Sequence, residues 1–110
     1  MASGQEVQAI FQHAKSKQYA MPAVNVVGSN TVNTVLETAR EVNAPVIIQF
    51  SNGGAQFNAG KGLSNEGQRA AIAGSIAGAH HIHALAQAYQ TPVILHTDHC
   101  AKIFCLGLMD

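Results

Sequence analysis

Apolar residues along this chain follow two spacings, and the two alternate. In residues 4–18 and 29–43 they recur every three or four positions, which aligns them on one face of a helix. Residues 66–89 are rich in alanine with a few larger apolar residues, which indicates one long helix or two shorter helices that pack closely. Short runs rich in β-branched residues lie between these stretches. The spacing therefore predicts helices that alternate with strands.

Three apolar runs, residues 21–27, 44–50 and 91–96, are the predicted strands. Each has proline as its second residue, where the missing N–H donor disturbs a sheet least. The runs are apolar almost throughout, which is typical of parallel strands covered on both faces. Strands that alternate with helices are joined by right-handed parallel crossovers, so the pattern predicts either a doubly wound sheet or a (β/α) barrel. It does not choose between the two.

The ends of these elements carry local signals. Ser3 and Glu6 have the spacing of a capping box, which predicts the start of the first helix. The Ser-Asn pair at 29–30 offers an N-cap for the second helix, and Asn43 suits its end. Residues 51–65 are rich in Gly, Asn and Ser and are predicted to form a long loop, which in compact domains is usually functional or mobile.

The composition limits the classes of function. The 110 residues allow one domain, and Lys+Arg 6 balances Asp+Glu 6 to a net charge of +0. A neutral chain without a basic run lacks the electrostatic footprint of proteins that bind nucleic acid or acidic membranes. No stretch reaches the roughly 18 apolar residues of a membrane helix, and no signal-peptide pattern opens the chain, so we expect a cytoplasmic protein. Only 11% of residues are charged, which indicates that much of the surface is meant for burial.

Polar residues gather where the predicted strands end. In both candidate architectures, ligands bind at the carboxyl ends of the strands. A turn after the third strand would let Asp98 and His99 converge on one bound atom. The alternative for the amides and the serine is structural, as partners of the backbone or the cap of a turn. The residues are Asn25 in the first strand, Gln49 and Ser51 at the end of the second, and the run 96–100 at the end of the third.

Histidine and cysteine raise the question of a metal site, because five of the six histidines lie between residues 80 and 99. His80 and His83 have the i, i+3 spacing of a helical chelate, although helical histidines more often pack or face water. The two cysteines are typical of small buried hydrophobes. A structural zinc site is the alternative, with four nitrogen and sulfur ligands at a spacing that matches none of the strong zinc patterns. Those ligands would be His96, His99, Cys100 and Cys105.

Five short motifs occur in an order and at a spacing that resemble the N-terminal part of class II, zinc-dependent fructose-bisphosphate aldolases. They are PAVN at 22–25, QFSNGGA at 49–55, AGKG at 59–62, GAHH at 78–81 and HTDHCAK at 96–102. The Asp-His-Cys ending resembles the long-loop subgroup rather than the shorter one, which includes the tagatose-bisphosphate aldolases. The resemblance implies an α/β fold in which residues 1–110 form the first three strand–helix units of a (β/α)8 TIM barrel, incomplete as given.

The resemblance also implies roles for individual residues. His99 matches a ligand of the catalytic zinc, and Asp98 matches the acid/base residue. Ser51 matches a contact to a substrate phosphate, and Asn25 a position in the substrate pocket beside it. His96 matches a position without an assigned role, and the helical histidines match a helix without ligands. A second divalent metal, if the enzyme uses one, has its ligands outside this chain.

The implied reaction is the cleavage of fructose 1,6-bisphosphate to dihydroxyacetone phosphate and glyceraldehyde 3-phosphate, a step of glycolysis and gluconeogenesis. A carboxylate can take the proton of the C4 hydroxyl while zinc stabilises the enediolate that remains. The other aldolase chemistry uses a Schiff-base lysine on a strand. No lysine lies in a predicted strand, so the metal route is favoured. The lysines are Lys15, Lys17, Lys61 and Lys102.

The sequence also departs from the family pattern. A catalytic zinc needs about three protein ligands and an open position, whereas only His99 matches one here. After Lys102 the tail 103–110 differs from the Leu-Leu-Pro-Trp-like run of the family. We therefore expect a fragment that is inactive alone and whose parent is a homodimer acting on a small sugar bisphosphate. The alternatives are a tagatose-type aldolase, a non-catalytic zinc module, and a small α/β binding or scaffold protein.

Overall fold

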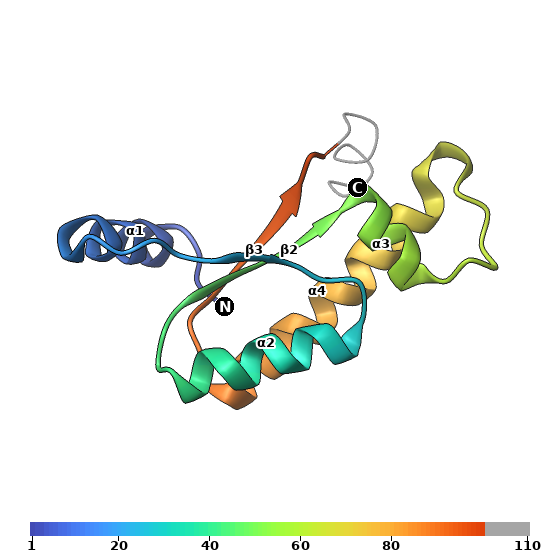
Figure 1. Ribbon diagram of the computed structural model, residues 1–110. Coiled ribbons are helices and arrows are strands. Elements are labelled where there is room, and N and C mark those ends of the chain that lie inside the picture. Colours follow the sequence, from blue (N-terminus) through green and yellow to red (C-terminus); the bar gives the residue numbers. More distant parts are fainter. Residues whose placement is uncertain (101–110) are drawn as a thin grey trace.

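The computed structural model describes residues 1–100, which form an alternating α/β structure (Figure 1). The predicted alternation of helices and strands is confirmed. None of the helices in residues 1–100 is both long and apolar enough to cross a membrane. The elements are α1 (Gln5–Lys17), β1 (Ala23–Asn25), α2 (Ser29–Glu41), β2 (Val46–Ser51), α3 (Asn52–Ala59), the 3₁₀ turn η1 (Glu66–Gln68), α4 (Arg69–Tyr89) and β3 (Val93–Asp98).

The three strands form one parallel sheet in the order β1-β2-β3. Each strand begins directly after the proline of its run, later than the predicted starts at residues 21, 44 and 91, because proline has no N–H to donate. β1 is only three residues long, shorter than predicted, whereas β3 extends beyond residue 96 because it pairs with β2 as far as Asp98 opposite Ser51. This strand order occurs both in a barrel and in one half of a doubly wound sheet, so topology alone leaves both open.

Helices α2 and α4 pack beside each other and against the sheet (Figure 1). Along β2 the side chains alternate, so Ile48 and Phe50 join the core while Gln49 and Ser51 point to the opposite face. The largest fully buried side chains are Leu36, Ile48, Ile82, Val26, Val32 and Val93. Helices α2 and α4, Ala55 of α3 and the sheet thus share one apolar core, and the other face of the sheet is left to polar residues near the strand ends.

The prediction of a loop over residues 51–65 is wrong for most of its length, because α3 lies within it. The Ser51 Oγ caps this helix by accepting from the Gly54 N–H at 3.0 Å. Asn58 Nδ2 donates to the Gly74 carbonyl at 2.8 Å, which ties α3 to α4. Glycine and asparagine disfavour helices by composition, but here the packing of α3 on α4 outweighs that preference.

The predicted helix caps are also wrong. Gly4 is the N-cap of α1, and no side chain caps this helix. The Glu6 N–H instead donates to the backbone carbonyl of Ser3 at 3.0 Å. Gly28 is the N-cap of α2, so residues 29–30 lie inside the helix. At the starts of both helices, backbone carbonyls accept hydrogen bonds from the N–H groups that the serine side chains were predicted to bind. The end signal at Asn43 is confirmed, since this residue takes a left-handed conformation with φ 53° just after α2.

The contact between α3 and α4 makes Gly74 a sensitive position. A Cβ added there would lie 1.7 Å from the Ala55 carbonyl oxygen, so the two backbones approach too closely for any side chain. We expect Gly74→Ala to lower the free energy of unfolding by about 1–3 kcal/mol or more, as overpacking does.

Gly53 in α3 is the matched control, because a Cβ there meets nothing within 4 Å. Gly53→Ala should stabilise the helix by roughly 0.5–1 kcal/mol. Equilibrium unfolding of both variants in urea measures the difference. Equal midpoints for the two variants would show that α3 does not pack on α4 in this way.

Candidate functional site

Polar side chains from all three strands meet on the sheet face opposite α2 and α4. Asn25 of β1 is in register with Gln49 of β2, and Gln49 is in register with His96 of β3. These three residues therefore form one level across the sheet. Ser51 and Asp98 are paired with each other two residues further along their strands, at the carboxyl edge.

Hydrogen bonds join four of these side chains into a row. His96 Nδ1 and Gln49 Oε1 are 2.9 Å apart, Gln49 Nε2 donates to Asn25 Oδ1 at 2.8 Å, and Asn25 Nδ2 donates to Asp98 Oδ2 at 3.5 Å. Gln49 is only 8% exposed. The side chains of Asn25 and Gln49 thus bond to other side chains rather than to the backbone, which was the structural alternative for them.

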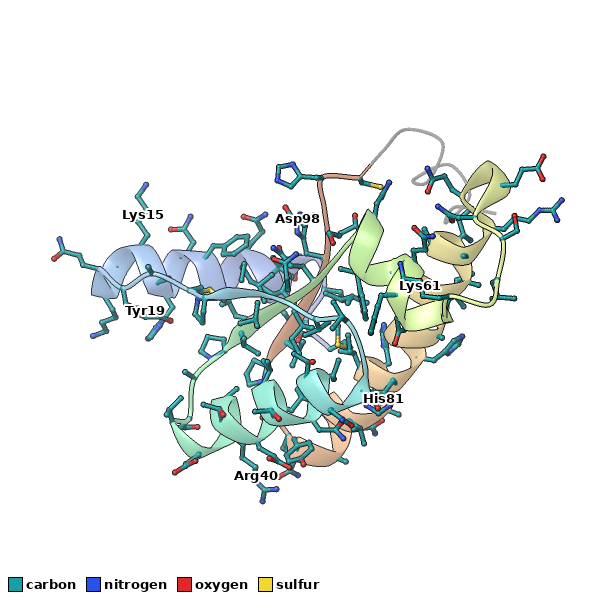
Figure 2. All side chains as sticks on the ribbon, turned by 45° about the vertical axis from the view of Figure 1, so that its right-hand side comes forward. Lys15, Tyr19, Arg40, Lys61, His81 and Asp98 are labelled. Atoms are coloured by element: carbon teal, nitrogen blue, oxygen red, sulfur yellow. The ribbon has the colours of Figure 1, made fainter. Side chains whose placement is uncertain are left out.

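Asp98 is the last residue of β3, and the chain turns at His99, which is the turn that would let the two side chains converge on one bound atom. His99 has a φ of 50°, which turns the chain out of the sheet, and its side chain is 91% exposed. Its Nε2 lies 3.7 Å from Asp98 Oδ1. One carboxylate oxygen therefore faces His99 while the other accepts from Asn25. Figure 2 shows Asp98 at the end of β3.

Ser51 has a structural partner as the N-cap of α3, which was the structural alternative for it. Its oxygen accepts one hydrogen bond, and its hydroxyl hydrogen is left to donate to a further acceptor. Because Ser51 is in register with Asp98, it lies at the same edge of the sheet as the carboxylate. The phosphate contact implied by the motif stays a prediction.

The helical histidines lie apart from this edge. His81 Nε2 bonds to Asn33 Oδ1 at 2.9 Å and so ties α4 to α2 (Figure 2). Within residues 1–100 no three His, Cys, Asp or Glu side chains are grouped so that they could hold a metal ion. A chelate by His80 and His83 alone, with only two ligands, stays a prediction. Of the alternative zinc ligands, Cys105 lies outside the described residues.

No lysine of residues 1–100 lies in a strand, as predicted. Lys15 and Lys17 occupy the last turn of α1, and Lys61 follows α3; Figure 2 shows Lys15 and Lys61 on these segments. Lys102 lies outside the described residues. In residues 1–100 the carboxyl ends of the strands thus offer a carboxylate, two imidazoles, amides and a hydroxyl, and no lysine lies in a strand there to form a Schiff base.

Among these residues, His99 is the one whose side chain could serve as a single ligand of a zinc ion. Imidazole is a common zinc ligand, the side chain of His99 is 91% exposed, and catalytic zinc usually has three protein ligands and one open position. The described residues supply no such set of three. The remaining ligands of a catalytic zinc would have to come from residues outside 1–100.

Comparison with known proteins decides the family. The family described as fructose-bisphosphate aldolase class-II matches residues 5–108. The chain belongs to this family. It is 62% identical over 99 residues to a fructose-bisphosphate aldolase of Edwardsiella ictaluri, a match that covers 90% of this chain and 28% of that protein. It is 60% identical over 101 residues to a class 2 fructose-bisphosphate aldolase of Escherichia coli K12, a match that covers 91% of this chain and 28% of that protein.

A solved structure decides the architecture. The crystal structure of a fructose-bisphosphate aldolase from Campylobacter jejuni matches with a TM-score of 0.86 and 52% identity, over 98% of this chain and 30% of that one. The three parallel strands correspond to the N-terminal part of its TIM barrel, so the barrel and not the doubly wound sheet is correct. The chain spans about 28% of the length of the curated relatives.

Sequence reasoning singled out every member of the polar row and missed that they are connected. Gln49 was noted only as a polar residue at a strand end, and His96 matched a position without a role. The signal that could have connected them is positional. Each directly follows or interrupts an apolar run of a predicted strand, and side chains at one level of neighbouring parallel strands point to the same face.

The missing ligands predict weak zinc binding by the 110-residue chain. We expect the chain to lose added zinc on dialysis, because zinc held by one histidine lacks the three or four protein ligands of stable sites. Metal analysis of the dialysed protein measures this. One tight zinc per chain that disappears in Cys105→Ser would instead support the structural zinc module.

Proposed function

We propose that this chain is the N-terminal part of a zinc-dependent enzyme that cleaves fructose 1,6-bisphosphate into dihydroxyacetone phosphate and glyceraldehyde 3-phosphate. The observation that carries the proposal is that Asp98 Oδ1 and His99 Nε2 lie 3.7 Å apart at the carboxyl edge of β3. Both residues lie in the part of the chain that matches the aldolase family. The edge of the strands is where barrel enzymes place their chemistry.

Asp98 is the acid/base residue of the proposal. Its carboxylate accepts the proton of the C4 hydroxyl when the bond between C3 and C4 breaks, and the same group can return a proton in the condensation direction. At 30% exposure its side chain is open enough to meet a substrate. The hydrogen bond from Asn25 and the nearby imidazole hold the carboxylate in place.

In the proposal, His99, Ser51 and Asn25 bind the metal or the substrate and do not transfer protons. His99 would hold the zinc through its imidazole. Zinc, when bound, supplies Lewis-acid stabilisation of the negative charge that develops beside the broken bond. The Ser51 hydroxyl would donate to a substrate phosphate at the start of α3, where helix dipole and free amides favour an anion. Asn25 would line the pocket between Ser51 and Asp98. We further propose a cytoplasmic homodimer, and any second divalent metal would have its ligands outside this chain.

The role of Asp98 is tested in the complete enzyme. We expect Asp98→Ala to lower kcat by roughly 10²–10⁴-fold, the usual contribution of a general acid or base, while the zinc content stays unchanged because Asp98 is not assigned as a ligand. A coupled assay of triose phosphate release and metal analysis measure the two quantities.

Glu37→Gln is the control for this substitution. Glu37 is an acidic residue on α2 that accepts from the Tyr89 hydroxyl at 3.3 Å, far from the strand ends, so its loss should leave kcat unchanged. A reduction of less than about tenfold in Asp98→Ala would remove Asp98 from proton transfer. Assays with tagatose 1,6-bisphosphate in parallel identify the preferred ketose bisphosphate.

The 110-residue chain by itself should not cleave the substrate. One zinc ligand and three strands cannot enclose a bisphosphate or hold the metal in a defined geometry. We expect no release of triose phosphates above background from the purified chain with zinc and fructose 1,6-bisphosphate. Zinc-dependent turnover by the chain alone would contradict this.

A further inference from the structure

Strand β1 has a free outer edge. In residues 1–100 the sheet order β1-β2-β3 gives β1 a hydrogen-bonded neighbour on one side only. The Pro22 carbonyl and the Val26 N–H both bond to β2. In a parallel pair every second residue bonds to a given neighbour, so the backbone groups of Ala23 and Asn25 point away from β2. An edge with unpaired N–H and C=O groups is a template on which another strand can pair.

The outer edge of β3 is less accessible. The Pro92 carbonyl accepts from Val46 of β2, so the backbone groups of Val93, one residue later, face the outer side. There the Val93 carbonyl accepts from the Ala2 N–H at 2.9 Å, and the start of the chain lies beside the start of β3 (Figure 1). A head-to-tail assembly, in which β3 of one copy pairs with β1 of the next, would have to displace this segment. The edge of β1 is therefore the easier one to reach.

An apolar groove of about 230 Å³ lies beside this edge, bounded by β1, α2 and the start of β2. Val24 of β1 and Val35 of α2 line it, and Val42 at its rim is 64% exposed. Natural proteins often protect a free edge with charged side chains, above all lysine. None of the residues that line this groove is charged. The chain's net charge of +0 also gives no overall repulsion between two copies.

We propose that a second copy of this chain covers the groove, and that the two copies form a closed dimer about a two-fold axis beside β1. Each copy then contributes the same surface, and the two β1 edges pair antiparallel. Neighbouring strands lie about 4.8 Å apart, so two helices that each cover the outer pair of strands lie roughly 10 Å apart across the axis. This is close to the spacing of packed helices. The two α2 helices thus close the two grooves against each other.

This pairing is a property of the 110-residue chain and is separate from the dimer proposed for the complete enzyme. In a closed barrel every strand has a neighbour on both sides, so a further strand of the parent would occupy the edge that the second copy uses here. β1 has only three residues, so few backbone bonds cross the axis and burial of the apolar groove supplies most of the affinity. The pairing does not depend on aldol cleavage.

Val42→Lys tests the groove. Val42 is the C-cap of α2 and is exposed, so the folded monomer accommodates a lysine there, whereas the dimer would bring two like charges into an apolar contact. We expect the unsubstituted chain to sediment at twice its mass of 11.5 kDa. Val42→Lys should raise the dissociation constant by at least about tenfold. Sedimentation over a concentration series measures both, and circular dichroism shows that the variant keeps its helices.

Ile76→Lys is the matched control. Ile76 is a branched aliphatic residue that is 47% exposed on the β3 side of α4, outside the groove, so the dissociation constant should stay unchanged. A second variant, Val42→Glu, should dissociate the dimer as Val42→Lys does. An equimolar mixture of these two variants should form a dimer again, because the opposite charges then lie on the two sides of one contact. Recovery in the mixture also shows that both variants are folded.

An unsubstituted chain that stays monomeric would overturn the proposal, and so would a dimer that Val42→Lys and Ile76→Lys weaken equally. Assemblies that grow beyond a dimer with concentration would contradict the closed two-fold arrangement and indicate head-to-tail pairing instead. A mixture of Val42→Lys and Val42→Glu that remains monomeric would also rule out the two-fold contact at this groove.

Discussion

The pairing of β2 with a parallel strand on each side is the constraint on which the rest of this structure depends. Val46–Ser51 is hydrogen-bonded to β1 and to β3, so its register is set twice. A shift by one residue would turn Gln49 into the apolar core and Ile48 out of it, because side chains alternate between the faces of a strand. The burial of Ile48 and Phe50 against the helices thus also places the polar row.

The helices have the complementary task of covering one face of this sheet closely. The backbone of Gly74 on α4 meets Ala55 of α3, and Gly78 leaves room for the ring of Phe50. Small residues thus bring the helical layer against the central strand. The long alanine-rich stretch of the sequence is suited to this close approach, and α3 becomes a helix because α4 offers it a surface.

The chain's low charge agrees with its relation to longer aldolases. Only 11% of its residues are charged, and several large apolar side chains stay exposed in the described part of the chain. The chain spans about 28% of the length of its curated relatives, so a surface of this kind is consistent with burial under further strands and helices of a barrel. The carboxyl edge of the strands holds the Asp98 carboxylate beside the imidazole of His99.

The sequence by itself determined the alternation of helices and strands, the strand starts at each proline, and the polar residues at the strand ends, because these depend on side-chain spacing and on local backbone chemistry. It also placed Asp98 next to His99 by adjacency. The tertiary structure alone decided that residues 52–59 are helical and that carbonyls replace the predicted serine caps. It alone joined Gln49 to Asn25 and His96, because hydrogen bonds between strands depend on register, which no local pattern encodes.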